Sequence, residues 1–109
     1  MERGEFRSGN IFEDIGFSPD EAYEMALKAD LAAKISSIMK VRNLSQSDVA
    51  RIANWTQPRV SAMLNSRLHK ISVERLFRVL GALNHNVRII IDVQPCEHSR
   101  TTVELASVR

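Results

Sequence analysis

Four stretches of the chain between residues 18 and 84 place apolar residues with the period of an α-helix. In the longest, apolar positions recur at spacings of four, four and three, which puts them on one helical face. They are Leu27, Leu31, Ile35 and Ile38. Ser18 is followed by Pro19 and, three positions on, by Glu21, which is the signature of a capping box. The pattern therefore predicts a helix that begins after Ser18 and runs to about Arg42.

Three shorter helices follow in the predicted order. They span 46–53, 57–65 and 73–84, capped in turn by Ser45, Thr56 and Ser72. Their inward positions are Val49, Ile52, Ala53, Val60, Met63, Leu64, Val73, Leu76, Phe77, Leu80 and Leu83. Asn43 is expected to end the long helix, and Asn54 lies in the turn before Thr56, where asparagine tolerates a positive φ. The chain is therefore predicted to be mainly helical.

The pattern changes after Asn86. Residues 87–93 form an apolar run rich in β-branched side chains, which predicts a strand that ends before Pro95. A single strand leaves unpaired backbone groups, so it needs a partner. Two partners are open: residues 101–108, in a hairpin, or the same strand of a second copy. The second case places one alternating set in a dimer interface, namely Val87, Ile89, Ile91 and Val93.

The length of 109 residues allows one small core and no second domain of ordinary size. We expect an irregular lead-in over residues 1–17 and one domain over residues 18–93. Residues 94–109 are expected to be a tail, either disordered or forming the second short strand.

The helices at 46–53 and 57–65, separated by a three-residue turn, have the spacing of a helix-turn-helix. The first turn of the second helix carries Gln57, Pro58 and Arg59, where most helices carry carboxylates. Gln57 is suited to paired hydrogen bonds with adenine and Arg59 with guanine, while Pro58 and Ala62 suit a thymine methyl group. An acidic residue there would repel phosphate, so this pattern predicts a helix that reads DNA.

The charge is unevenly distributed, although the net charge is only +2. Residues 1–33 contain three basic and eight acidic residues, a net −5, while residues 34–70 contain seven basic residues and Asp48, a net +6. The excess in the middle indicates an anionic partner, although a solvated mixed surface would also explain it. Lys40, Arg42, Arg67 and Lys70 are candidates for contact with phosphate.

Other chemistry finds little support. The single cysteine, Cys96, excludes an internal disulfide, and the three histidines lack the spacing of metal ligands. No phosphate-binding glycine loop or nucleophile motif is present, so we expect no enzyme activity, metal or cofactor. Neither a membrane span nor a secretory signal is evident, which predicts a soluble, cytoplasmic protein.

The run LSQSDVARIANWTQPRVSAMLN, residues 44–65, resembles the Cro/CI-type, or XRE-type, helix-turn-helix family. More narrowly, residues 8–93 are similar to HigA-like antitoxins through the segments SGNIFEDIGF, QPRVS and SVERL. The resemblance implies a compact domain of four to five helices with a C-terminal β-strand. Asn54 and Trp55 depart from the family pattern, since they stand where a glycine and a smaller aliphatic residue are common.

The resemblance also implies roles for individual residues. Gln46 would lie near a phosphate and brace Gln57, while Gln57, Arg59 and either Ser61 or Ala62 would approach base edges. The candidate DNA-binding residues are Gln46, Ser47, Thr56, Gln57, Pro58, Arg59, Ser61, Ala62, Asn65, Arg67 and Lys70.

These observations predict a sequence-specific repressor that binds operator DNA in the major groove. A homodimer is expected, because one helix reads few base pairs and a two-fold pair reads two half-sites about 34 Å apart. The HigA resemblance implies an autoregulating antitoxin that also binds a cognate RelE-like toxin. The alternatives are an XRE-type regulator with no toxin partner, or a protein-binding adaptor that has lost DNA binding.

Overall fold

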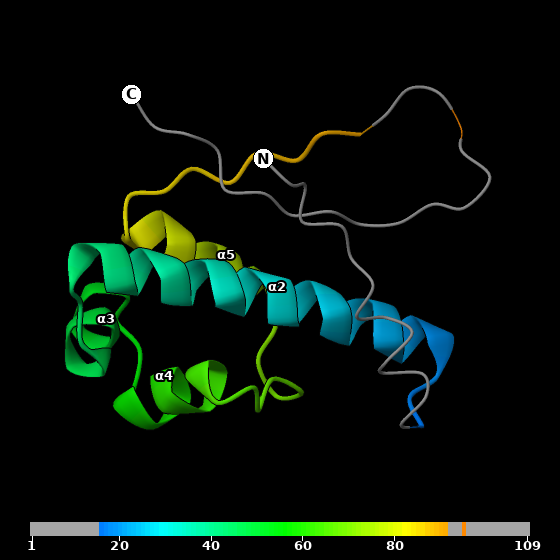
Figure 1. The fold of residues 1–109 in the computed structure, drawn as a ribbon, viewed down its shortest axis with the longest axis horizontal. Coiled ribbons are helices and arrows are strands. Elements are labelled where there is room, and N and C mark those ends of the chain that lie inside the picture. The colour runs from blue at the N-terminus through cyan, green and yellow to red at the C-terminus, as the bar shows by residue number, and fades with distance from the viewer. Residues whose placement is uncertain (1–15, 92–94, 96–109) are drawn as a thin grey trace.

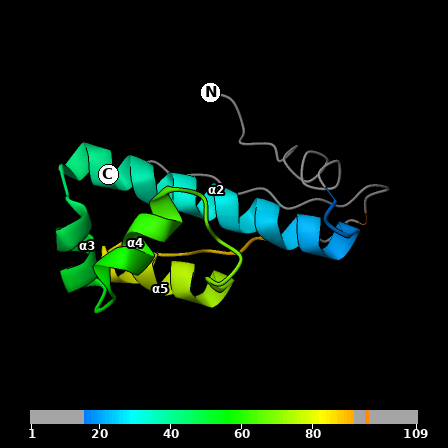
Figure 2. The same ribbon diagram turned by 90° about the horizontal axis from the view of Figure 1, so that it is seen from below.

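The computed structural model describes residues 16–91 and residue 95. Within them the chain forms four helices (Figures 1 and 2). These are α2 (Pro19–Arg42), α3 (Gln46–Ile52), α4 (Gln57–Leu64) and α5 (Val73–Ala82). The long α2 packs against α4 and α5, and α3 packs against α4. The four predicted helices are confirmed, with ends that differ by one or two residues.

Helix α2 has the predicted capping box at its start. The Ser18 hydroxyl accepts a hydrogen bond from the Glu21 N–H at 3.2 Å, and the Ser18 N–H donates to the Glu21 carboxylate at 3.0 Å. At the other end Asn43 adopts the left-handed conformation, with a φ of 56°. This conformation turns the chain away from the helix axis, so that α3 begins only four residues after Arg42.

The turn between α3 and α4 depends on Asn54 and Trp55. Asn54 has a φ of 52°, as its residue type predicted, and the Trp55 N–H donates to the Ala50 carbonyl at 2.8 Å. The Trp55 side chain is half-buried against the core, and the Arg75 guanidinium lies 5.5 Å from the centre of its ring. Trp55 thus joins the turn to α5 by packing and by a cation–π contact.

The starts of α4 and α5 differ from each other. Ser72 caps α5, because its hydroxyl accepts a hydrogen bond from the Arg75 N–H at 3.0 Å. Thr56 occupies the predicted N-cap position of α4, but its side chain makes no capping hydrogen bond. The predicted N-cap position of Thr56 is therefore confirmed, but the predicted capping hydrogen bond from its side chain is wrong.

The core lies between α2 and the three shorter helices. Each helix contributes buried apolar side chains, and the connection between α4 and α5 adds two more. The residues exposed by less than 3% in this core are Leu31, Ile35, Val49, Val60, Met63, Leu68, Leu76, Val79 and Leu83. Six residues that were expected to point inward are only partly buried at its edge, namely Leu27, Ile52, Ala53, Leu64, Val73 and Phe77.

After α5, residues 87–91 form neither a helix nor a paired strand within the described part of the chain. The end of the predicted strand, residues 92–93, and its possible hairpin partner, residues 101–108, lie outside the described residues. Figure 1 shows this segment, in yellow to orange, on the opposite side of α2 from α4. Ile89, Ile90 and Ile91 are 70–82% exposed, so both alternating sets of side chains face outward. A strand needs a pairing partner, and the described residues supply none, so the strand over residues 87–93 stays a prediction.

Candidate nucleic-acid interface

The first turn of α4 exposes the side chains of Gln57, Pro58 and Arg59. It contains no acidic residue, whereas the first turns of α2, α3 and α5 each contain at least one. On the opposite face of α4, Val60 and Met63 are buried in the core. The apolar face therefore holds α4 against the domain and leaves a first turn without negative charge on the surface.

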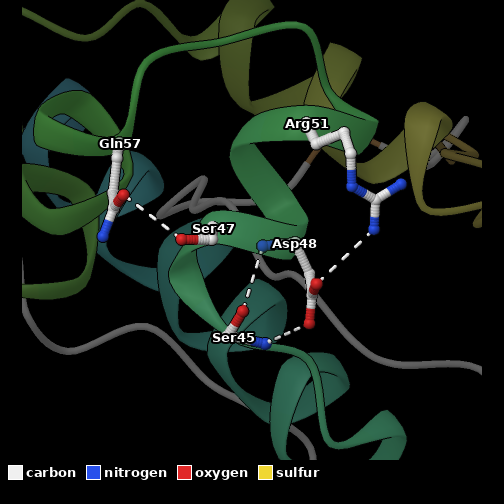
Figure 3. A network of polar contacts seen from close by, with 5 residues as sticks. All are labelled: Ser45, Ser47, Asp48, Arg51 and Gln57. Carbon is white, nitrogen blue, oxygen red and sulfur yellow. Dashed lines mark hydrogen bonds and ion pairs between the residues drawn. The ribbon is translucent and has the colours of Figure 1, made fainter.

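A hydrogen bond joins the first turns of the two motif helices. The Ser47 hydroxyl donates to Gln57 Oε1 at 3.2 Å (Figure 3), and both residues are exposed. Gln57 Oε1 keeps a second lone pair, and the amide NH₂ keeps its two donors. The residue that holds Gln57 is thus Ser47, whereas the family resemblance implied Gln46, which is half-buried one position earlier.

Ser47 lies between the two residues that form the capping box of α3, Ser45 and Asp48. The Ser45 hydroxyl accepts a hydrogen bond from the Asp48 N–H at 3.1 Å, and the Asp48 carboxylate accepts one from the Ser45 N–H at 2.9 Å (Figure 3). Arg51 lies 3.4 Å from the same carboxylate. The backbone N–H of Ser45, with a smaller contribution from its side chain, lowers the pKa of Asp48 below its ordinary value. Asp48, the one acidic residue between positions 34 and 70, is therefore occupied by the cap and by Arg51.

The end of α4 carries a second polar pair. The Asn65 amide NH₂ donates to the Ser61 carbonyl at 2.9 Å and to the Ser61 hydroxyl at 3.3 Å. Because the hydroxyl oxygen is the acceptor, its own hydrogen is available to another partner. Ala62 is also partly buried, and it packs against the core.

The connection between α4 and α5 exposes three cationic or titratable side chains, Arg67, His69 and Lys70. Between and beside them, Leu68 and Ile71 are 2% and 5% exposed. The Ile71 N–H donates to the Leu68 carbonyl at 3.0 Å, which closes a turn with His69 and Lys70 at its tip. The buried ends of this turn therefore project its tip into solvent.

Two further basic residues that were considered for phosphate contact lie on α2. Lys40 is exposed. The Arg42 guanidinium instead donates a hydrogen bond of 2.5 Å to the carbonyl of Leu83, the C-cap residue of α5. Arg42 therefore joins the ends of two helices, a structural contact that its position in the sequence did not reveal.

Sequence reasoning also missed Lys28, which is 4% exposed. Its ammonium group lies 3.2 Å from the Glu24 carboxylate and donates to the Leu68 carbonyl at 3.3 Å. The pattern did contain a signal, because Lys28 precedes Leu31 by three positions and Ile35 by seven, and so shares their buried face.

The part of the chain that the structure describes contains neither a metal-binding group nor a membrane-spanning helix. No group of three histidine, cysteine or acidic residues is arranged to hold a metal ion there. None of the helices in that part has the length and apolar character needed to cross a membrane.

Comparison with known proteins agrees with this geometry. Residues 11–92 match the model of a family described as a helix-turn-helix domain, so the chain belongs to that class. A solved structure of a protein assigned to the XRE family of transcriptional regulators is 32% identical, with a TM-score of 0.67. The match covers 80% of this chain and 98% of that one, and the chain thus belongs to the XRE family. No curated protein matches it.

Proposed function

We propose that the protein is a transcriptional repressor that binds operator DNA by inserting α4 into the major groove. The observation that carries this proposal is the first turn of α4, which is exposed, free of carboxylates and held by the Ser47–Gln57 hydrogen bond. Gln57 would pair with adenine and Arg59 with guanine, and Pro58 would contact a thymine methyl group. Repression would follow from occlusion of the promoter, without a cofactor.

Phosphate contacts would surround this reading helix. Gln46 and Ser47 are the first residues of α3, and Thr56 is the N-cap residue of α4, so all three would contact phosphates beside the first turn of α4. Thr56 supports this role because its hydroxyl is not used as a helix cap. Beyond α4, the exposed Asn65, Arg67 and Lys70 would contact the backbone. Of the two residues considered for the third base contact, Ser61 is the better candidate, because Ala62 packs against the core and the Ser61 hydroxyl has a free hydrogen.

The active form would be a homodimer. The support is the exposed apolar segment after α5, in which Val87, Ile89 and Ile91 are 41%, 70% and 82% exposed. Pairing of this segment with its copy would satisfy its backbone groups and cover these side chains; Val93, the fourth member of the alternating set, lies outside the described residues. Sedimentation equilibrium of the wild type and of Ile89→Lys tests the dimer. A monomeric wild type would contradict it.

Footprinting on the DNA upstream of the protein's own gene tests the proposed function. The wild type, Gln57→Ala and Arg59→Ala should be compared at two salt concentrations, with Arg78→Ala on the exposed face of α5 as the control. We expect the wild type and the control to protect two half-sites one helical turn apart, and the α4 variants to lose that protection. Absence of protection, or equal protection by the α4 variants, would exclude α4 as the reading helix.

A second candidate function is that of an antitoxin that also binds a RelE-like toxin. The favouring observation is the start of α2, where Asp20, Glu21 and Glu24 are exposed beside Tyr23, itself 53% exposed. An acidic surface with an aromatic side chain suits a basic protein partner. Co-expression with the product of a neighbouring small basic reading frame tests it, using wild type, Tyr23→Ala and a chain lacking residues 1–17. If no such product binds the wild type, the regulator without a toxin partner remains.

A further inference from the structure

Lys28 is a buried charged residue that the reading helix does not explain. Its side chain is 5% exposed, and a buried ammonium group is costly unless it is paired and hydrogen-bonded. Glu24, one turn earlier on α2, supplies the opposite charge from a side chain that is 60% exposed. The remaining contact is the hydrogen bond to the Leu68 carbonyl, forty positions along the chain.

The Leu68 carbonyl, in the connection between α4 and α5, accepts two hydrogen bonds. It accepts the hydrogen bond from the Ile71 N–H that closes the turn, and it accepts the second one from Lys28. Figure 2 shows this connection passing beside α2 before it descends to α5. Lys28 therefore attaches the base of the turn to α2, the long helix that packs against both α4 and α5.

We propose that Lys28 is a positioning residue for DNA binding, which holds the 68–71 turn so that Arg67 and Lys70 meet the DNA phosphates. This inference rests on the proposed function. Lys70 is at the exposed tip of the turn, and Arg67 directly precedes Leu68, so a shift of the Leu68 carbonyl moves both side chains. Lys28 is too deeply buried to contact DNA itself, and it acts through the turn.

Packing alone does not account for a lysine at this position. The space lies on the buried face of α2, where an apolar side chain of similar length would avoid the cost of burying a charge. What the lysine adds is a donor that reaches a backbone carbonyl in the turn. The distinguishing property of Lys28 is thus this donor, and Lys28→Met removes it while retaining most of the volume.

The matched control is Lys34→Met. Lys34 lies on the same helix and pairs with Asp30, also one turn earlier, at 3.4 Å. Lys28→Arg keeps a donor, and Lys28→Gln gives a second variant without the long donor in case the methionine variant does not fold. Circular dichroism and thermal unfolding establish that each variant is folded at the temperature of the binding measurement.

Fluorescence anisotropy should measure binding of these variants to operator and to random DNA over a range of salt concentrations. We expect Lys28→Met to weaken binding to both DNAs by about fivefold and to lower the salt slope by about one. The loss should be recovered in Lys28→Arg and absent in Lys34→Met. In a chain that already carries Arg67→Ala and Lys70→Ala, Lys28→Met should cause no further loss.

Hydrogen exchange supplies a readout that does not depend on DNA. We expect faster exchange of the Ile71 amide in Lys28→Met, with unchanged exchange of the Leu76 amide inside α5. Unchanged affinity and salt slope, an equal loss in the Arg67→Ala/Lys70→Ala chain, or unchanged Ile71 exchange would each overturn the role of Lys28. If wild-type protein shows no specific binding to its upstream DNA, the proposed function fails, and the inference fails with it.

Discussion

Ser47, in the first turn of α3, donates a hydrogen bond of 3.2 Å to the side chain of Gln57, in the first turn of α4. The two helices of the motif are therefore joined at the surface proposed to face DNA, as well as through their buried sides. This bond limits the rotamers of a side chain that would otherwise be free in solvent. A base-reading residue that is ordered before binding loses less conformational entropy when it binds.

The first prediction concerns this bond. Ser47→Ala should weaken binding to the operator by about 0.5–1 kcal/mol, because Gln57 loses its partner while its own contacts with the base remain possible. Anisotropy measurements on Ser47→Ala, Gln57→Ala and the double variant form a double-mutant cycle. We expect the double variant to lose less than the sum of the single losses. Strict additivity would mean that Ser47 contributes only through its own contact with DNA.

The second prediction separates base reading from phosphate contact. Arg59→Ala should cost about 1–3 kcal/mol on the operator and relax the preference at one base position, because a bidentate guanidinium–guanine contact is lost. Lys70→Ala should weaken binding to operator and random DNA alike and lower the salt slope by about one. Binding to a set of single-base operator variants checks both. Equal loss for Arg59→Ala on specific and random DNA would contradict base reading.

The third prediction concerns stability. Arg42→Gln should lower the free energy of unfolding by about 1 kcal/mol, because the buried C-cap residue Leu83 loses the donor to its carbonyl. Arg51→Gln is the control, since its ion pair with Asp48 joins side chains that are 73% and 38% exposed and such pairs contribute little. Urea denaturation at neutral pH measures both. A similar loss in the two variants would assign no special role to the Arg42 contact.

The fourth prediction concerns acid. Capping hydrogen bonds from the serine N–H groups lower the pKa of Glu21 and of Asp48 in the folded chain. A carboxylate with a lowered folded pKa stabilises the fold above its unfolded pKa, and this stabilisation is lost as the pH falls through the folded value. The free energy of unfolding should therefore decrease as the pH falls below about 4.5.

Urea denaturation of the wild type, Glu21→Gln and Asp48→Asn at pH 7 and at lower pH checks this dependence. Each variant should be less stable than the wild type at pH 7, and the difference should shrink in acid, because the protonated wild-type carboxyl no longer gains from its charge. A difference that stays constant down to pH 3 would show that the charge of the carboxylate does not contribute.

The sequence alone determined the four helices and the motif that two of them form. Capping signals are local, since a serine hydroxyl and a carboxylate three residues on can bond only to the helix end beside them. Ser18, Ser45 and Ser72 therefore cap as predicted, Asn43 ends α2 as predicted, and Asn54 adopts the positive φ expected of it. The exposed, carboxylate-free first turn of α4 also followed from the spacing of its buried residues Val60 and Met63.

The tertiary structure decided the contacts between residues that are distant in the chain. The Ser47–Gln57, Arg42–Leu83 and Lys28–Leu68 bonds span 10, 41 and 40 positions. Which polar group meets which carbonyl depends on how the helices cross, and the hydrophobic pattern specifies only which faces are buried. For the same reason the spacing of Lys28 indicates a buried face, whereas its hydrogen bond to Leu68 in the α4–α5 connection depends on how the four helices pack together.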